Sequence, residues 1–346
     1  MNIVDIHAHI IPEGVLGTAG PHGPEMTRTE SGSYTIRAGS LVGVAKTKAH
    51  KAHAAGEGGE DPNGWMERLA SPVRRLAEMD EKGIDAMVVS PSPPLFMHGI
   101  EPEYAVPYAR TYNDELFRYC AQDPSRLYFL ATLPLQDVKE SVAEARRAIG
   151  ELGARGVYIG ASDLGGRELD DPELWPLFEE LIRADLPLAI HPGPLSFFNG
   201  PHDRYREKPA LGFPAQETHA IFMLIAGGVL DTFPDLKVLV SHGGGFFPYQ
   251  YSRIDDFLDV ADDSKAKRPV VEYFEHLYFD CLLHDVRARR LLLEVAGIDH
   301  VMMGSNYAGL DSVDGIALVE ELGLPEEDRA RLIGGTAKRL FKLGNR

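Results

Sequence analysis

Two histidines near the start of the chain, His7 and His9, close a short apolar run that begins at Ile3. Residues two apart on a β-strand point to the same face, so both imidazoles can bind one metal ion. Such a pair alone is equally compatible with histidines that only form hydrogen bonds. The pair is therefore a candidate metal site that needs further ligands.

Three later apolar runs also end in polar side chains that are suited to such a site. These side chains are His191, His242 and Asn306. Two histidines from one strand and His191 from another would surround a metal on three sides and leave positions open for water or substrate, as catalytic metals require. This recurrence predicts a metalloenzyme.

Three glycines, Gly243, Gly244 and Gly245, follow His242, and such a turn lets the backbone approach a ligand closely. Three roles are open for His242: a fourth metal ligand, a general acid or base beside the metal, or a structural residue bound to a neighbouring loop. The acid/base role suits an imidazole, which titrates near neutral pH.

The elements that must position these side chains follow a repeating pattern. From about residue 69, short apolar runs alternate with longer amphipathic segments, as in βα units on a parallel sheet. Eight strands are predicted, at 3–7, 85–89, 127–131, 155–159, 187–191, 237–241, 277–280 and 299–303. Helices are predicted at 71–82, 107–122, 137–152, 172–185, 215–232, 248–258, 284–296 and 325–342. We expect one domain, residues 1–346, folded as a (β/α)8 barrel with its active site at the carboxyl ends of the strands.

Residues 12–68 interrupt this pattern, because they are rich in Gly, Pro, Ser, Thr, Lys and His and show little apolar periodicity. We expect an insertion after the first strand and not a separate domain. Loops after barrel strands lie on the catalytic face, so the insertion would form a lid or a wall of the substrate pocket. The alternative is a surface excursion without a role.

Composition excludes several classes of protein. Hydrophobic residues make up 44% and charged residues 25%, and no apolar run is long enough to span a bilayer. The first residues lack the features of a secretory signal, and two cysteines give no disulfide framework. A net charge of -17 opposes binding to nucleic acid. We therefore expect a cytoplasmic protein with neither a membrane nor a nucleic acid as partner.

Several motifs together resemble the metal-dependent amidohydrolase superfamily, in the branch of aminocarboxymuconate-semialdehyde decarboxylase and related nonoxidative decarboxylases. The resemblance covers nearly the whole chain but does not identify the substrate. The motifs that carry it are Asp5-Ile6-His7-Ala8-His9, Leu76-x-x-Met79-Asp80-x-x-Gly83, Thr132-Leu133-Pro134, Gly156-Val157-Tyr158-Ile159-Gly160, His191-Pro192, Gly227-Gly228-Val229 with Phe233-Pro234, Ser241-His242-Gly243-Gly244-Gly245, and Gly304-Ser305-Asn306-Tyr307.

The resemblance implies one divalent ion, usually zinc and in some relatives manganese. Its ligands would be His7, His9, His191 and a carboxylate at the end of the last strand. The catalytic histidine of the branch corresponds to His242.

The resemblance also implies a homodimer, in which Arg253 reaches the partner's site and binds a carboxylate of the substrate. A guanidinium group is suited to that task. The alternative is an arginine on a surface helix, paired with Asp255 or Asp256.

Asn306 departs from the family pattern, which has an aspartate at this position. An amide oxygen can still bind a metal, but it brings no negative charge and cannot accept a proton from bound water. Either the chain carries an inactivating Asp→Asn replacement or it has diverged, and the otherwise intact motifs favour a replacement. Asp311 lies five residues further on, and we do not expect it to substitute.

We expect nonoxidative decarboxylation of a small aromatic or unsaturated, muconate-type carboxylic acid. The second hypothesis is hydrolysis of a lactone, an amide or a ring C–N bond, and the third is an inactive barrel that acts as a binding protein. Phe198 and Tyr307 follow predicted strands and could contact a flat, conjugated substrate. Ordinary packing is the alternative for both side chains.

Overall fold

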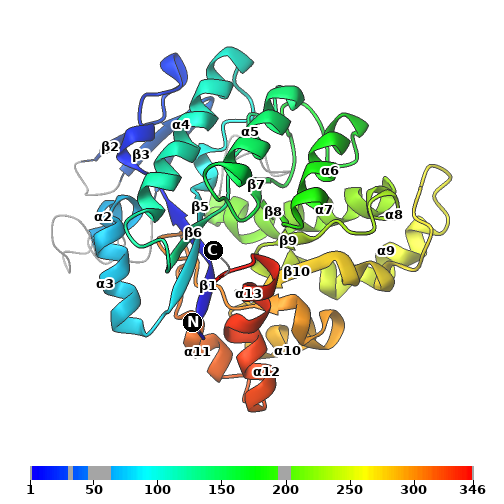
Figure 1. Cartoon of the computed structure of the whole chain (residues 1–346). Coiled ribbons are helices and arrows are strands. Elements are labelled where there is room, and N and C mark those ends of the chain that lie inside the picture. Colours follow the sequence, from blue (N-terminus) through cyan, green and yellow to red (C-terminus); the bar gives the residue numbers. More distant parts are fainter. Residues whose placement is uncertain (1, 30–33, 46–63, 194–203, 345–346) are drawn as a thin grey trace.

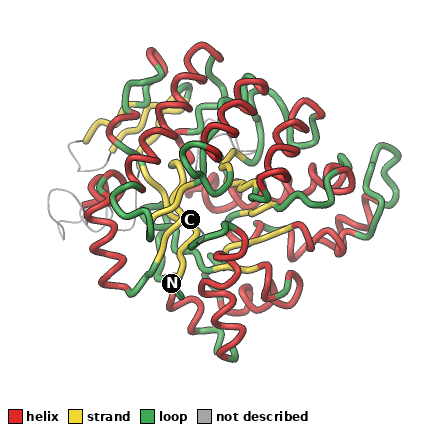
Figure 2. Tube along the Cα trace, in the orientation of Figure 1, coloured by secondary structure: helices red, strands yellow, loops and turns green. Residues whose placement is uncertain are grey.

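A computed structural model describes residues 2–29, 34–45, 64–193 and 204–344. Eight parallel strands lie at the centre of the molecule and helices surround them (Figure 1, Figure 2). The strands are β1 Val4–Ile10, β5 Ala86–Pro91, β6 Leu127–Phe129, β7 Val157–Gly160, β8 Leu188–His191, β9 Val238–Val240, β10 Leu277–Asp280 and β11 Val301–Met302. Each predicted strand overlaps one of these eight.

The eight strands close into a barrel. Hydrogen-bonded pairing gives the orders β1-β5-β6 and β7-β8-β9-β10-β11. Two parallel bridges join these sheets, one between Ala131 and Val157 and the other between Ala8 and Tyr307. The predicted (β/α)8 barrel is confirmed, and the carboxyl ends of all eight strands meet on one face.

Apolar side chains fill the barrel interior, as expected for strands rich in valine, isoleucine and leucine. The interior cluster includes Val4, Ile6, Val88, Leu130, Leu239 and Met302. Ala337, Leu340 and Phe341, from helix α13 (Thr336–Leu340) and the residue after it, belong to the same cluster. Helix α13 lies beside β1 and covers the end of the barrel opposite the catalytic face (Figure 1).

The other helices surround the barrel: α2 Trp65–Ala70, α3 Pro72–Lys82, α4 Pro102–Cys120, α5 Val138–Gly150, α6 Trp175–Ala184, α7 Phe213–Ala226, α8 Val229–Thr232, α9 Phe247–Leu258, α10 Val286–Ala296, α11 Gly315–Glu320 and α12 Glu326–Ala330. Aspartates cap the amino ends of α5 and α10, where Asp137 and Asp285 accept hydrogen bonds from backbone N–H groups of the first turns. The helix predicted at 215–232 is divided in two, because Gly228 adopts a left-handed conformation. The sequence analysis predicted neither α2 nor α11.

The insertion at 12–68 contains a small antiparallel sheet that the sequence analysis did not predict. Its strands are β2 Glu25–Arg28, β3 Tyr34–Ala38 and β4 Leu41–Ala45, in the order β2-β3-β4. Ile36 and Ala38 are buried in a cluster that includes Leu95 and Ile100 of the loop after β5. This packing attaches the described part of the insertion to the catalytic-face loops, whereas residues 46–63 lie outside the described residues.

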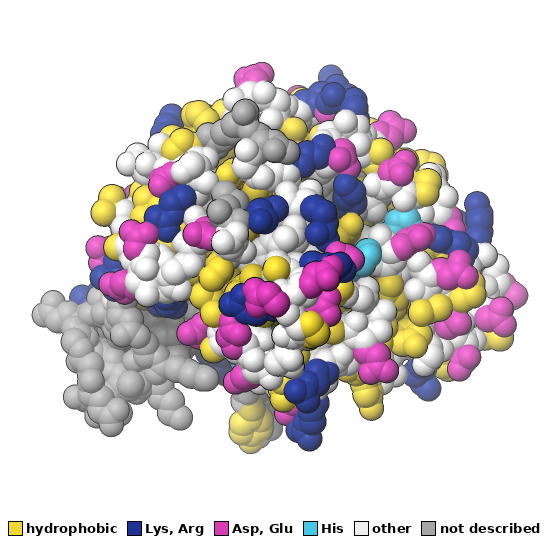
Figure 3. Space-filling model, turned by 60° about the horizontal axis from the view of Figure 1, so that its bottom comes forward, with side chains coloured by type: hydrophobic (Ala, Val, Ile, Leu, Met, Phe, Trp, Pro, Cys, Tyr) yellow, Lys and Arg dark blue, Asp and Glu magenta, His cyan; other side chains and the backbone are white. Residues whose placement is uncertain are grey.

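Charged side chains of both signs are interspersed on the molecular face shown in Figure 3. Many are paired, for example Arg329 with Glu320 at 2.6 Å and Arg331 with Asp299 at 3.3 Å. No helix among the described residues is long and apolar enough to cross a membrane.

Candidate metal centre and active site

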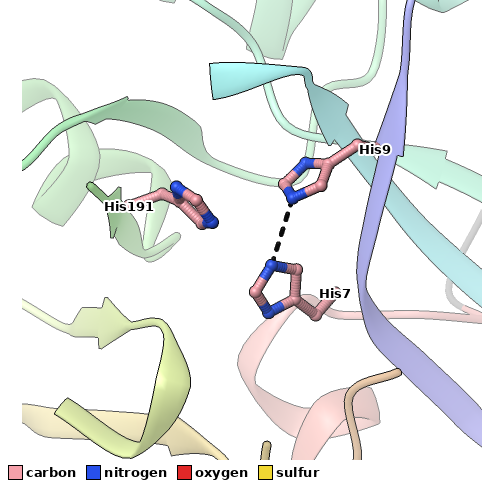
Figure 4. Close-up of side chains that lie close together, drawn as sticks. All are labelled: His7, His9 and His191. Carbon is pink, nitrogen blue, oxygen red and sulfur yellow. Dashed lines mark hydrogen bonds between the residues drawn. The ribbon is translucent and has the colours of Figure 1, made fainter. Parts of the chain in front are cut away.

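His7, His9 and His191 come together inside the catalytic face of the barrel (Figure 4). His7 and His9 belong to β1 and His191 is the last residue of β8. One ring nitrogen from each lies within 4.8 Å of the other two, and all three side chains are buried. The structure therefore places the three predicted ligands around one point.

Hydrogen bonds determine which nitrogen of His7 is left for a ligand. Nδ1 of His7 lies 2.7 Å from Oδ2 of Asp280, a carboxylate that can only accept. Nδ1 therefore carries a proton, which leaves Nε2 as the nitrogen available to a ligand. A carboxylate behind a histidine in this way is common at metal centres.

Hydrogen bonds also determine which ring nitrogen is protonated in His9 and in His191. The Ser90 hydroxyl donates to the Ala8 carbonyl at 3.2 Å, so it can only accept from Nδ1 of His9 at 3.4 Å. Nδ1 of His191 donates to the Pro192 carbonyl at 2.8 Å. Both rings therefore leave Nε2 unprotonated.

The resulting arrangement fits a cation. Nε2 of His7 lies 3.3 Å from Nε2 of His9, and Nε2 of His191 has no hydrogen-bond partner among the described residues. Burial lowers the pKa of His9 and of His191 well below the ordinary value, so both rings are neutral, the form that binds metals. Three imidazole nitrogens that converge on one point can hold a divalent ion.

Asp280, which the sequence analysis missed, connects this cluster to His242. Besides His7, Asp280 accepts hydrogen bonds from the backbone N–H groups of His242 and Gly243, at 3.0 and 3.1 Å. Burial alone would raise the pKa of Asp280, but the hydrogen bond and charge of His7 hold it below the ordinary value. The signal for this residue was its place at the carboxyl end of a predicted strand.

His242 follows β9 and its ring lies against the metal cluster. The ring centroids of His7 and His191 are 5.0 and 4.9 Å away, but no nitrogen of His242 belongs to the group that converges on one point. Instead, Nδ1 of His242 lies 2.6 Å from Oε1 of Glu217, a fully buried residue of α7. The geometry thus favours the acid/base role over a fourth ligand.

The Glu217–His242 pair keeps a proton close to the cluster. Burial alone would lower the pKa of His242, but the charge of Glu217 and the hydrogen bond raise it to about 9. Burial raises the pKa of Glu217 to about 7, against the opposing effect of His242. At neutral pH the pair therefore holds His242 as an imidazolium, which is a proton donor.

Asn306 lies beyond β11, close to the two histidines of β1. Its neighbour Tyr307 forms backbone hydrogen bonds with His7 and His9, at 3.1 and 3.0 Å. The Asn306 amide nitrogen donates to Asp311, and its amide oxygen is buried without a partner among the described residues. Asp311 therefore returns to the strand end, contrary to our expectation that five residues would carry it away.

The residues that were predicted to contact the substrate do not lie together at the histidine cluster. The ring of Tyr307 is buried between the guanidinium groups of Arg68 and Arg75, at 4.5 and 4.2 Å, and so packs within the protein. Arg253 is exposed on α9, lies over Phe257 at 4.9 Å and forms no ion pair among the described residues. Phe198 lies outside the described residues.

A wall of aromatic rings lies next to the cluster. The Tyr158 ring lies 5.7 Å from that of His191 and 5.4 Å from Phe96, which in turn stacks on His98 at 5.3 Å. Nε2 of His98 accepts from the N–H of Gly160, and burial lowers the pKa of His98 to about 4, so the ring is neutral. Its protonated Nδ1 has no acceptor among the described residues.

Comparison with known proteins agrees with this arrangement. The sequence profile of the amidohydrolase family matches residues 4–343. The chain is 33% identical to the 2-amino-3-carboxymuconate-6-semialdehyde decarboxylase of Dictyostelium discoideum over 282 residues, which cover 80% of this chain and 77% of the relative. It is 33% identical to the gamma-resorcylate decarboxylase of Rhodococcus jostii over 289 residues, 78% of this chain and 87% of that protein.

A solved structure shares the fold along the entire chain. It is the dihydroxybenzoic acid decarboxylase of a Polaromonas species, determined with manganese and the inhibitor 2-nitroresorcinol. The TM-score is 0.76 and the sequence identity 23%, over 100% of this chain and 98% of the other. The match of the family profile to nearly every residue, together with the two similar decarboxylases, shows that this chain belongs to the amidohydrolase family, in the branch of the aminocarboxymuconate-semialdehyde and gamma-resorcylate decarboxylases.

Proposed function

We propose that this protein is a metal-dependent nonoxidative decarboxylase that acts on a small aromatic or unsaturated carboxylic acid. The observation that carries the proposal is the buried Glu217–His242 pair beside the three imidazoles that converge on one point. Decarboxylation by protonation of carbon needs a proton donor, whereas hydrolysis by metal-bound water needs a base. The Glu217–His242 pair supplies the donor, and the family's aspartate, which could serve as a base, is replaced by Asn306.

Different side chains would bind the metal ion and donate the proton. His7, His9, His191 and the amide oxygen of Asn306 would hold the divalent ion, which when bound polarises a substrate oxygen as a Lewis acid. The imidazolium of His242 transfers its proton to the carbon that bears the carboxylate. The bond from this carbon to the carboxylate then breaks, its electron pair stays with the remaining molecule, and carbon dioxide leaves. His242 finally regains a proton from solvent.

The identity of the ion is part of the proposal. Three imidazole nitrogens are ligands that suit zinc, and zinc remains our first expectation. Manganese is bound in the Polaromonas decarboxylase, which makes it the alternative. Elemental analysis of the purified protein, followed by removal and separate return of each ion, distinguishes the two.

We further propose a homodimer formed through α9. Large apolar side chains are exposed on and around this helix, including Phe246, Tyr249, Phe257 and Val260. Arg253 lies on the same helix and does not ion-pair within the described part of its own chain. A second copy that covers this surface would bury the apolar groups and bring Arg253 towards its neighbour's substrate carboxylate.

A decarboxylation screen tests the main proposal. The purified protein would be incubated with dihydroxybenzoic, hydroxy-methoxy-benzenedicarboxylic and muconate-type acids, and released carbon dioxide measured. We expect release from at least one acid, its loss after chelation and its return with the added ion. His242→Gln should keep the ion and lose the activity. Products that have gained water instead of losing carbon dioxide would support the hydrolase hypothesis and contradict ours.

Three finer expectations remain predictions. They are a lid or pocket wall formed by residues 12–68, contact of Phe198 with substrate, and a cytoplasmic location. An inactive binding protein, the third hypothesis, would need neither the neutral tautomers of the cluster nor the proton donor beside it.

A further inference from the structure

The side chain of Asn306 is held in one orientation by Asp311. Asn306 adopts a left-handed conformation, which asparagine tolerates better than most residues. Its amide nitrogen donates to Oδ1 of Asp311. Because this bond identifies the nitrogen, the buried atom on the other side of the amide is the oxygen, which has no hydrogen-bond partner among the described residues.

Two fixed neighbours place this amide at the histidine cluster. Ser305 is tied to Asp5 of β1, whose Oδ1 accepts from the Ser305 backbone N–H at 3.1 Å. The same oxygen accepts from the backbone N–H of His7 at 3.1 Å. Tyr307, on the other side, pairs with β1 between His7 and His9. Asn306 is therefore held beside both β1 ligands.

Backbone hydrogen bonds fold the loop after Asn306 so that Asp311 lies next to the Asn306 side chain. The N–H of Gly309 donates to the Asn306 carbonyl at 2.8 Å, and the N–H of Val313 donates to the Ser305 carbonyl at 2.9 Å. A side chain at position 309 would overlap the Asn306 amide, so glycine allows the loop to pack directly on it. Oδ2 of Asp311 lies 3.4 Å from Nε2 of His284.

We propose that Asp311 is a positioning residue for metal binding, which acts through Asn306. Its carboxylate turns the amide oxygen towards the cation and, by accepting from the amide nitrogen, increases the negative charge on that oxygen. The Asn306–Asp311 pair thereby takes the place of the single aspartate found elsewhere in the branch. This inference rests on the cation site of the proposed function.

The pair also makes Asn306 the residue that suits this site. An aspartate at position 306 would have no N–H to donate to Asp311, and two carboxylates would then face each other. Like charges so close disfavour one another. The effect of Asp311 on metal affinity must therefore depend on which residue occupies position 306.

Metal affinity measured in four proteins tests this dependence. The proteins are wild type, Asp311→Asn, Asn306→Asp and the double variant, each freed of metal and titrated with Mn²⁺ and with Zn²⁺ against a chromophoric chelator. With Asn306 present, Asp311→Asn should weaken binding by about tenfold or more. In the Asn306→Asp background, the same change should leave affinity unchanged or increase it.

The controls separate positioning from damage to the loop. Asp263→Asn removes one carboxylate from an exposed turn and should leave affinity unchanged. Equal losses in both backgrounds would mean that Asp311 only holds the loop, and an unchanged affinity with Asn306 present would also overturn the inference. If only the proteins that carry Asn306→Asp bound metal, the inference would fail together with the proposed function, because the natural chain would hold no ion; equal affinities in all four proteins would overturn the inference alone. If none of the four bound either ion, the proposed function would fail as well.

Discussion

Asp280 shows how much a single buried side chain contributes to this site. Its Oδ2 accepts from the ring of His7 and the backbone of His242, and its Oδ1 accepts from the backbones of Gly243 and Leu282. One carboxylate thus sets the tautomer of a metal ligand and the position of the proton donor. In the proposed reaction, metal binding and proton transfer would be coupled through it.

Asp280→Asn should therefore weaken metal binding by about 10–100-fold, the usual effect of removing the partner of a ligand histidine. It should also lower the free energy of unfolding by about 2 kcal/mol, because an amide cannot satisfy all four donors. Chelator competition and urea denaturation measure the two effects. Asp263→Asn is the matched control for lost charge, and an unchanged metal affinity in Asp280→Asn would contradict the prediction.

Glu217 should determine the pH range of the reaction. The raised pKa of His242 means that the donor is present at neutral pH and is lost as the pH rises through about 9. In Glu217→Gln the main raising influence is gone and the lowering effect of burial remains, so activity should fall at a lower pH. The alkaline limb of kcat/KM against pH measures this shift. The control is Glu179→Gln, on an exposed face of α6, which should leave the alkaline limb of kcat/KM at the same pH. If Glu217→Gln also left this limb unchanged, Glu217 would not be the group that raises the pKa of His242.

At the scale of elements, the turn between β9 and α9 places His242 in an unusual backbone conformation. His242 and the three following glycines all have positive φ, between 47° and 76°. A methyl group on Gly245 would overlap the carbonyl of Pro214 at the start of α7, the helix that carries Glu217. The turn therefore packs His242 and its partner helix against each other.

Gly245→Ala should accordingly destabilise the protein by about 3 kcal/mol or more, because a backbone with φ 65° and ψ -123°, which residues other than glycine rarely adopt, costs about 1–3 kcal/mol and the overlap adds to it. Gly153→Ala is the matched control, since Gly153 has φ 77° but no heavy atom lies near its missing side chain. Gly153→Ala should lose only the part of the free energy of unfolding that comes from the backbone conformation. Urea denaturation of both variants gives the difference, and equal losses would show that the turn tolerates a side chain.

The sequence predicted those parts of this architecture that depend on local pattern. Apolar runs located all eight strands, and the alternation of β1 placed His7 and His9 on one face. The partners of these side chains could not be found in this way, because Asp280 lies 273 residues from His7 and Glu217 lies 25 residues from His242. The sheet β2-β3-β4 was missed although Tyr34, Ile36 and Ala38 alternate with polar residues, because its strands are short and only tertiary packing buries Ile36 and Ala38.

For the whole molecule, the proposed dimer makes a quantitative prediction. Arg253→Ala chains and His242→Gln chains would each be inactive alone. Random mixing makes half of the dimers mixed, each with one intact site, so about a quarter of wild-type activity should return if Arg253 acts across the interface. Mass spectrometry under native conditions verifies that mixed dimers form. Mixed dimers without activity would show that Arg253 does not act across the interface.

The closure of the barrel between β1 and the segment after β11 has a consequence for synthesis of the protein. His7 leaves the ribosome well before Asp280, which lies 273 residues further along the chain. Contacts between such distant parts of a chain form slowly. The nascent polypeptide thus carries the two histidines of β1 long before the carboxylate that orients His7 has been made.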